Sequence, residues 1–400
     1  MTENVEAKLK DFLKYSMEHS KYYEYALSYN GDIEDFRVLK KEDVKRNATE
    51  LHSTGINGKS PNNMVRTYTS GTDGIPLNIC WLKSDYIRAN IELWRKRYKY
   101  YNITATSRKL SFNLGGKDMI SYSNYGLDIN KTAIYDPSLF LDIHKTIMNF
   151  APDWIYVKPH IFKFYMQQIN MNGFCFPNSV KYIEFVGENI SASEEERIRN
   201  ELGVSVGNLY GSEEMNAIAL ECPWHKMHII ENNVFVEVQD GNGGIKKQGR
   251  GAAILTNMQN HYMPFIRYYQ GDQISIYKIQ CPCKCGENGR VIAKIHGRVT
   301  ELFSRNGKII SSSILSEIMN DIDYVLNYPI NRYMFIYKKS KGKLTLTLEL
   351  KDSFTNWKHA VSEQIVETIR DRLEIDVDLT FCELPMDNER QKRQILLVED

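Results

Sequence analysis

The sequence has no long apolar run, no excess of either charge and little glycine or proline. No stretch approaches the ~18–20 apolar residues that a membrane-spanning helix needs. The 51 basic and 50 acidic side chains leave a net charge of +1, so a nucleic-acid backbone, which attracts a basic face, is not an expected partner. The 24 glycines and 11 prolines among 400 residues exclude collagen-like and low-complexity classes.

The cysteines do not form the framework of a secreted disulfide protein. They number seven, which is odd, and they are unevenly spaced. The first residues, MTENVEAKLKDF, are acidic and amphipathic, unlike a signal peptide. We therefore expect a cytoplasmic protein, and a chain of this length has room for two or three domains.

The middle of the chain alternates between two hydrophobic patterns. Residues 154–157 and 180–186 are short apolar segments typical of buried parallel strands. Residues 139–150, 160–172 and 193–202 have helical periodicity. This alternation predicts an α/β layer with a largely parallel sheet.

The pattern changes after about residue 225. Apolar segments separated by glycine-rich turns predict strands at 234–238, 251–256, 265–268 and 273–277. From about 299 the order helix, strand, strand, helix, strand predicts a small α+β domain. The fold class we predict is therefore α/β, with a large N-terminal domain of mostly parallel sheets and a β-rich subdomain, plus a small, mobile α+β domain; the boundaries are 1–298 and 299–400.

One loop, which follows an expected strand at 64–69, consists almost entirely of small residues. In Ser70-Gly71-Thr72-Asp73-Gly74-Ile75-Pro76 the absence of bulky side chains lets backbone N–H groups, together with the hydroxyls of Thr69, Ser70 and Thr72, converge on one anion. An ordinary Ser/Thr/Gly turn has a similar composition. The order Ser-Gly-Thr-x-Gly-x-Pro after a strand favours a site for the β and γ phosphates of a nucleotide.

The segment YTSGTDGIP resembles the phosphate loop of the adenylate-forming enzymes, the superfamily of acyl-CoA synthetases and adenylation domains. It is most similar to the phenylacetate–CoA ligase and CapK-like branch, in which the lysine that ends the loop elsewhere is commonly missing. Here Leu77 follows Pro76. Further motifs of the superfamily follow in the same order along nearly the whole chain.

Two of these motifs concern the adenine. Gly187-Glu188, after the expected strand, resembles the Gly-x-Glu segment that lines the adenine and substrate pocket. Tyr210 and Gly211 open the segment YGSEE, which resembles the Tyr-Gly-x-Ser/Thr-Glu motif. The resemblance implies that Tyr210 stacks near adenine.

The same motif implies a magnesium-binding glutamate. By position this residue is Glu214, while Glu213 occupies the position of the usual hydroxyl residue. The choice between these two carboxylates stays open.

Two later motifs concern the ribose and the hinge. RYYQGD, residues 267–272, resembles Arg-Tyr-x-Thr-Gly-Asp, which implies that Asp272 accepts hydrogen bonds from both ribose hydroxyls. Gly297-Arg298 resembles the Gly-Arg before the family hinge, where the arginine contacts ribose and phosphate oxygens. The resemblance places rotation of the small domain near Thr300.

The catalytic lysine near the C-terminus has no clean counterpart. The family pattern Arg-x-x-Gly-Lys-x-x-Arg is replaced by DNERQKR, which places Arg390 at the lysine position and Lys392 two residues later. Either residue is a candidate, although arginine and lysine differ in geometry. A solvated basic loop is an equally good interpretation.

The cysteines provide evidence independent of these motifs. Cys222 and His228 are separated by five residues, and Cys283 and Cys285 form a Cys-x-Cys pair far downstream. Two short-range pairs joined across a long loop are typical of a closed structural zinc site of three cysteines and one histidine. His225 competes with His228, and Cys281 competes with either downstream cysteine.

The resemblance implies an enzyme that uses ATP and Mg²⁺ to convert a small carboxylic acid, aromatic or short-chain, into an acyl-adenylate. A second nucleophile (CoA, a carrier-protein thiol or an amine) then takes the acyl group. The missing lysine motivates an alternative, a degenerate homologue that serves as a nucleotide-binding or assembly module. A zinc-dependent nucleic-acid binder is disfavoured by the neutral charge.

Overall fold

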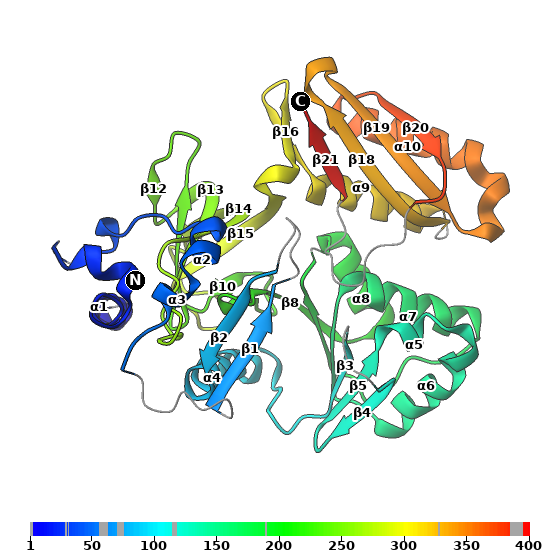
Figure 1. The fold of residues 1–400 in the computed structure, drawn as a ribbon. Helices are drawn as coiled ribbons and strands as arrows, with labels where there is room; N and C mark the ends of the chain where they lie inside the picture. Colours follow the sequence, from blue (N-terminus) through cyan, green and yellow to red (C-terminus); the bar gives the residue numbers. More distant parts are fainter. Residues whose placement is uncertain are drawn as a thin grey trace. The chain divides into compact units, whose positions relative to one another are not determined.

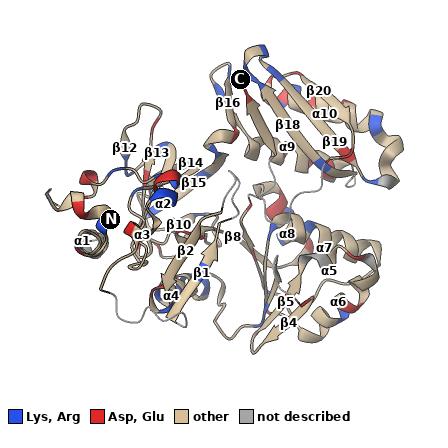
Figure 2. Ribbon diagram, in the orientation of Figure 1, with Lys and Arg blue, Asp and Glu red and all other residues tan. Residues whose placement is uncertain are grey.

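The computed structural model describes residues 3–28, 30, 32–55, 63–69, 76–113, 118–188, 190–326, 329–384 and 395–400. The chain forms two compact units (Figure 1). The first contains Met1–Gln270 and Ile276–Ala293, and the second contains Gly271–Ser275 and Lys294–Asp400. Basic and acidic residues are interspersed over both units (Figure 2). No described helix is long and apolar enough to cross a membrane.

The first unit contains eight described helices and most of the strands. The helices are α1 (Glu3–His19), α2 (Lys41–Arg46), α3 (Ala48–Leu51), α4 (Lys83–Tyr101), α5 (Lys131–Ile134), α6 (Pro137–Phe150), α7 (Pro159–Met171) and α8 (Ala192–Leu202). The strands up to β9 are β1 (Met64–Tyr68), β2 (Asn78–Leu82), β3 (Lys109–Asn113), β4 (Ile120–Ser123), β5 (Gly126–Asn130), β6 (Trp154–Val157), β7 (Tyr182–Val186), β8 (Ser205–Ser212) and β9 (Asn216–Glu221). The later strands are β10 (Met227–Ile229), β11 (Val234–Gln239), β12 (Ile245–Lys246) and β13 (Gly249–Asn257). Two more strands, β14 (Tyr268–Lys278) and β15 (Arg290–Arg298), have residues in both units.

Thirteen of these strands form one sheet in the order β12-β11-β13-β14-β15-β10-β9-β8-β7-β6-β3-β5-β4, while β1 and β2 form a separate hairpin. The block β8-β7-β6-β3-β5 is parallel. The pairings of β4 with β5 and of β8 with β9 are antiparallel. The predicted α/β class is confirmed: the parallel strands lie in the 108–212 segment, and the strands after 225 form the β-rich part.

Helices cover both faces of the parallel block. Residues of α5, α6, α7 and α8 pack with alternate strand residues into one large apolar cluster. Leu93 and Tyr100 of α4 pack with Leu209 on the other face. Ser191 caps α8, because its hydroxyl accepts a hydrogen bond from the Glu194 N–H.

A buried ion pair joins α4 to the sheet. The Arg97 guanidinium donates to both carboxylate oxygens of Glu184 on β7, at 2.8 and 2.6 Å. Neither residue is more than 6 % exposed. The guanidinium also lies 4.6 Å from the ring centre of Trp94 and 5.0 Å from that of Trp154.

Strand β14 differs from the sequence-based expectation. Two separate strands were expected at 265–268 and 273–277, yet residues 265–267 lie in no strand and Tyr268–Lys278 is one continuous strand. The glycine interpreted as a turn, Gly271, lies within the strand with φ of +84°. A left-handed glycine inside a strand changes its direction without ending it.

The second unit is a four-stranded sheet with two helices and a small hairpin. Its elements are β16 (Leu302–Arg305), β17 (Lys308–Ser311), α9 (Ser312–Val325), β18 (Ile330–Lys338), β19 (Lys343–Leu350), α10 (Lys358–Leu373), β20 (Val377–Phe381) and β21 (Leu396–Glu399). Alternate residues of β19 face a core that α9 and α10 complete. The expected α+β character is confirmed, and the sheet also gains β21, which pairs in parallel with β18.

Candidate active site and candidate metal centre

The two predicted adenine segments lie side by side at the carboxyl edge of the parallel block. Val186 of β7 is paired with Leu209 of β8, so Gly187 and Tyr210 follow at the same edge. Gly187 has φ of +80°, a left-handed conformation that side chains rarely adopt. The chain therefore turns away from the sheet directly beside Tyr210.

Gly211 is needed for a close approach of two backbones. A Cβ atom at this position would lie 2.5 Å from the carbonyl oxygen of Asn216. The pairing of β8 with β9 shifts register between Tyr210 and Gly211. This tight crossing positions the turn that contains Glu213 and Glu214.

The two glutamates of this turn have different surroundings. Glu214 is buried, and its carboxylate accepts a hydrogen bond from the Tyr268 hydroxyl at 3.0 Å. The backbone carbonyl of Glu214 accepts a second bond from the Asn257 amide at 2.7 Å. Glu213 is exposed. The Glu214 carboxylate is therefore held by β14, whereas the Glu213 carboxyl lies nearer the surface and has its pKa raised by partial desolvation.

This turn adjoins the β1–β2 hairpin, which leads into the predicted phosphate loop. Trp81 on β2 donates from its indole nitrogen to the Glu213 carbonyl at 3.4 Å. Thr69 closes the neck of the loop: its N–H donates to the Leu77 carbonyl at 3.0 Å, and its hydroxyl oxygen accepts from the Leu77 N–H at 2.8 Å. The remaining loop residues predicted to bind phosphate lie outside the described residues; they are Ser70, Gly71, Thr72 and Gly74.

The predicted ribose residues belong to the second unit. Asp272 on β14 is 7 % exposed, and its Oδ1 lies 3.0 Å from Nε of Arg298, the last residue of β15. An ion pair thus joins the Asp272 motif, RYYQGD, to the Gly297-Arg298 motif. Arg390 and Lys392 lie outside the described residues.

One partner in the site was missed by the sequence-based predictions. His160, in the first turn of α7, has its Nδ1 atom 2.8 Å from both carboxylate oxygens of Glu188. From the sequence alone His160 is an ordinary residue of an amphipathic helix. The signal that points to it is its position three residues after an apolar parallel strand, β6, where a strand-to-helix junction lies at the carboxyl edge of the sheet.

Comparison with solved structures identifies the fold. A 2-hydroxyisobutyryl-CoA ligase in its postadenylation state aligns over 99% of this chain and 89% of its own, with a TM-score of 0.76 and 16% identity. The chain has the fold of the adenylate-forming ligases. An anthranilate–CoA ligase bound to anthranoyl-AMP aligns over 82% of this chain and 65% of its own, with a TM-score of 0.57 and 15% identity. An amide bond synthetase from Marinactinospora thermotolerans aligns over 88% of this chain and 77% of its own, with a TM-score of 0.54 and 12% identity. No protein-family model and no curated protein matches this sequence.

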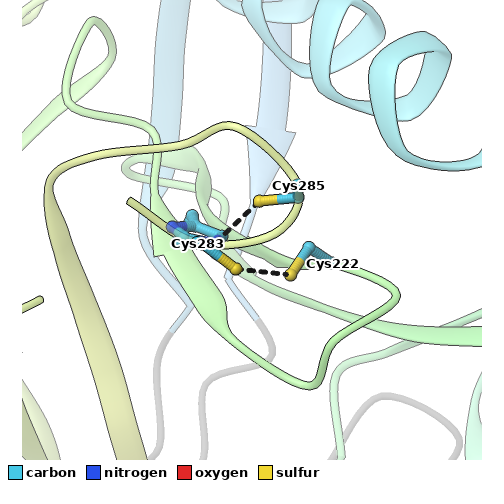
Figure 3. A group of neighbouring side chains, drawn as sticks. Cys222, Cys283 and Cys285 are labelled. Carbon is cyan, nitrogen blue, oxygen red and sulfur yellow. Dashed lines mark hydrogen bonds between the residues drawn. The ribbon is translucent and has the colours of Figure 1, made fainter. Parts of the chain in front are cut away.

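Within this adenylate-forming fold, the four predicted metal ligands lie together. One ligand atom from each of Cys222, His228, Cys283 and Cys285 lies within 4.8 Å of all the others. Figure 3 shows the three cysteine side chains meeting from the end of β9 and from the loop between β14 and β15. The Cys222 and Cys283 sulfurs are 3.8 Å apart, and the Cys285 sulfur is 3.2 Å from Nε2 of His228.

These separations fit a tetrahedral ion. With Zn–S bonds of about 2.3 Å, two ligating sulfurs are about 3.8 Å apart. Burial lowers the pKa of His228 to about 4, so its ring is neutral at pH 7. The donor set and its spacing are therefore those of a closed structural zinc site, with no position left for water.

Two tight turns present the ligands. The Cys222 N–H donates to the Lys226 carbonyl at 3.0 Å, which folds the chain between Cys222 and His228. In the other turn the Gly286 N–H donates to the Cys283 carbonyl at 2.7 Å, and Gly286 has φ of +79°. The short spacings in the sequence thus correspond to two turns that face each other.

The competing histidine belongs to a different group. His225 Nδ1 lies 3.2 Å from the Glu221 carboxylate, and together with Glu195 these side chains form a separate cluster. Burial, followed by the charge of Glu221, raises the pKa of Glu195 to about 7. Cys281 is exposed and lies outside the four-residue group.

Proposed function

We propose that this protein is a ligase that activates a carboxylic acid with ATP. The acid's carboxylate oxygen attacks the α-phosphorus of ATP, an acyl-adenylate forms, and pyrophosphate leaves with the electron pair of the broken P–O bond. The thiol of CoA then attacks the acyl carbon and releases AMP. In this respect we expect the chain to behave as a phenylacetate–CoA-ligase-like enzyme.

Each predicted residue has one task in this reaction. Tyr210 stacks near the adenine, Gly187 and Glu188 line the adenine and substrate pocket, and Asp272 with Arg298 binds the ribose. Gly211 allows the close strand crossing that presents the Glu213–Glu214 turn.

Three groups would stabilise the negative charge of the phosphates: the phosphate loop, a metal-binding carboxylate and a C-terminal cation. Thr69 closes the neck of the loop whose N–H groups and hydroxyls receive the phosphates. Glu214 is the carboxylate that fits Mg²⁺, because its orientation is fixed by Tyr268. Mg²⁺ would offset charge on the phosphates. Arg390 or Lys392 would supply the cation during adenylation.

The observation that supports this proposal most strongly is the convergence of motifs distant in sequence. Gly187 and Tyr210 share one sheet edge, and the turn after Tyr210 adjoins the hairpin that carries the loop neck at Thr69. Ligands of open α/β sheets bind outside the carboxyl ends of the strands. The 2-hydroxyisobutyryl-CoA ligase of similar fold has been captured with an acyl-adenylate and CoA.

The proposal predicts acid-dependent exchange of pyrophosphate into ATP. The purified protein should be assayed with a panel of aromatic and short-chain acids, with hydroxamate trapping as a second readout of the acyl-adenylate. At least one acid should give exchange, and added CoA should then convert it to a thioester with release of AMP. If ATP binds but no acid supports exchange, the chain is a nucleotide-binding or assembly module instead.

The four-residue cluster is proposed to hold a structural zinc ion. The ion would join the turn after β9 to the loop between β14 and β15. Lys96 and Lys99 of α4 both pair with Glu287 of that loop, at 2.6 and 2.7 Å, so the helix already anchors the same loop. A metal there supports the fold rather than the chemistry.

Metal analysis tests this site directly. We expect about one zinc ion per chain in the purified protein, and almost none in the double variant Cys283→Ser/Cys285→Ser. The matched control is Cys175→Ser/Cys382→Ser, which changes two exposed thiols outside the cluster and should keep its zinc. An unchanged zinc content in the first variant would discard the ligand set.

A further inference from the structure

The order of the parallel strands marks one point of the sheet as a crevice. Strand β3 has β5 on one side and β6 on the other. The chain passes from β3 to β5 in one direction, and then from β6 through β7 to β8 in the opposite direction. In open α/β sheets such a reversal leaves a crevice outside the carboxyl ends of the two strands, and ligands bind there.

Lys158 is the residue that follows β6 at this crevice. It is half-buried, and its Cε lies 3.6 Å from the position that a Cβ atom at Gly187 would take. Among the described residues, no hydrogen bond or ion pair engages its ammonium group. A partly desolvated charge without a partner is unfavourable until an anion binds.

The carboxylate of the adjoining segment is already occupied. Glu188 follows Gly187, and its two oxygens both lie 2.8 Å from Nδ1 of His160. In that pair the histidine side chain is 43% exposed and the glutamate 25% exposed. The Glu188 carboxylate is thus engaged by His160, and no ion pair joins it to Lys158 among the described residues.

The position of Lys158 separates it from the adenine motif on β8. Strand β7 lies between β6 and β8, so the two carboxyl ends are about 10 Å apart at a strand spacing of about 4.8 Å. The backbone of Lys158 is therefore one strand further from Tyr210 than Gly187 is, and its side chain reaches Gly187, which lines the substrate part of the predicted pocket as well as the adenine part.

We propose that Lys158 binds an oxyanion of the second or third substrate, a carboxylate of the acid or a phosphate of CoA, and that His160 is the positioning residue that leaves this lysine available. The inference rests on the proposed function and deepens it: the preferred acid is one with a second anionic group, or else the crevice is part of the CoA site.

The test compares Lys158→Gln with wild type in the complete ligase reaction. We expect the KM of either the acid or CoA to rise about 10- to 100-fold, with the KM of ATP unchanged. Which of the two KM values rises identifies the source of the oxyanion. Lys158→Arg should recover most of the loss. The control is Lys181→Gln, which removes an exposed lysine immediately before the opposite end of β7 and should leave all three KM values unchanged.

A second variant tests the role of His160. His160→Ala should raise the same KM as Lys158→Gln, because Glu188 then competes for the ammonium. The double variant His160→Ala/Lys158→Gln should have the same KM as Lys158→Gln alone. Additive increases in KM would contradict a coupling between the two residues. Rescue by His160→Gln, whose amide can still donate to Glu188, would separate positioning from general disruption.

The outcomes distinguish this inference from the proposed function. If wild type forms an acyl-adenylate and Lys158→Gln keeps all three KM values, the inference is wrong and the proposed function stands. If wild type shows no exchange with any acid, the proposed function is wrong. Calorimetric titration of both proteins with CoA and with a small dicarboxylate, succinate, then decides the inference, and equal dissociation constants, or no binding to either protein, would overturn it.

Discussion

Replacing Asp272 by alanine should lower kcat/KM for ATP by about 10²- to 10⁴-fold, because in the proposed ribose site the variant would lose two hydrogen bonds from ribose hydroxyls to the carboxylate. Each such bond contributes about 1.5–3 kcal/mol. The carboxylate is 7 % exposed and is held by Arg298 at 3.0 Å, so it is preorganised to accept them. Asp272→Asn, which keeps the shape but not the charge, should lose less.

The specificity of the loss can be checked with modified nucleotides. Wild type should prefer ATP over 2′-deoxy-ATP, and Asp272→Ala should remove most of that preference, since the missing hydroxyl no longer has its acceptor. Asp240→Ala is a suitable control, because Asp240 lies in an exposed turn between β11 and β12. Retention of the full ATP preference by Asp272→Ala would exclude the ribose role.

Replacing Arg97 by methionine should lower the free energy of unfolding of the first unit by about 3–5 kcal/mol. The substitution removes the cation and leaves the Glu184 carboxylate, which has no exposed surface, without its counter-charge. Only the Tyr182 hydroxyl, which donates to Glu184 at 3.2 Å, remains of the described partners. Urea unfolding followed by tryptophan fluorescence measures this, because Trp94 and Trp154 flank Arg97.

Two further variants isolate the buried pair. Arg95→Met removes an arginine of the same helix whose side chain is 69% exposed and paired with Glu92. This substitution should lower the free energy of unfolding by less than about 1 kcal/mol. Replacing both members, as in Arg97→Met/Glu184→Leu, should recover much of the stability lost in the single variant. Equal effects of the two single arginine substitutions would show that the buried charge is compensated in another way.

The parts of this protein that the sequence predicted are those encoded within a short stretch. The apolar segments before Gly187 and Tyr210 are continuous runs, and each glycine marks a conformation or approach that a side chain would obstruct. The metal ligands come in two close pairs, so their turns could be anticipated from spacing. The α/β class followed from the alternation of such segments and is confirmed.

The parts that escaped prediction depend on contacts between distant residues. Arg97 and Glu184 are 87 residues apart and read as ordinary surface charges until α4 lies on the sheet. Likewise, nothing local distinguishes His225 from His228. The distinction arises because His228 lies on β10, facing the thiols, while His225 lies in the preceding turn beside Glu221. The loop at 70–75 and residues 385–394 lie outside the described residues, so their predicted roles stay predictions.

The β14–β15 hairpin has a mechanical consequence. The loop that carries Cys283 and Cys285 connects β14 to β15 at one end of the hairpin. Asp272 and Arg298 lie toward the other end, where both strands have residues in the second unit. Two hydrogen-bonded strands resist bending far better than one linker. If the cysteines hold the proposed zinc ion, its removal should therefore increase the motion of the strands at Asp272 and Arg298, the proposed ribose residues. Nucleotide affinity should then fall although no residue of the adenine motifs has changed.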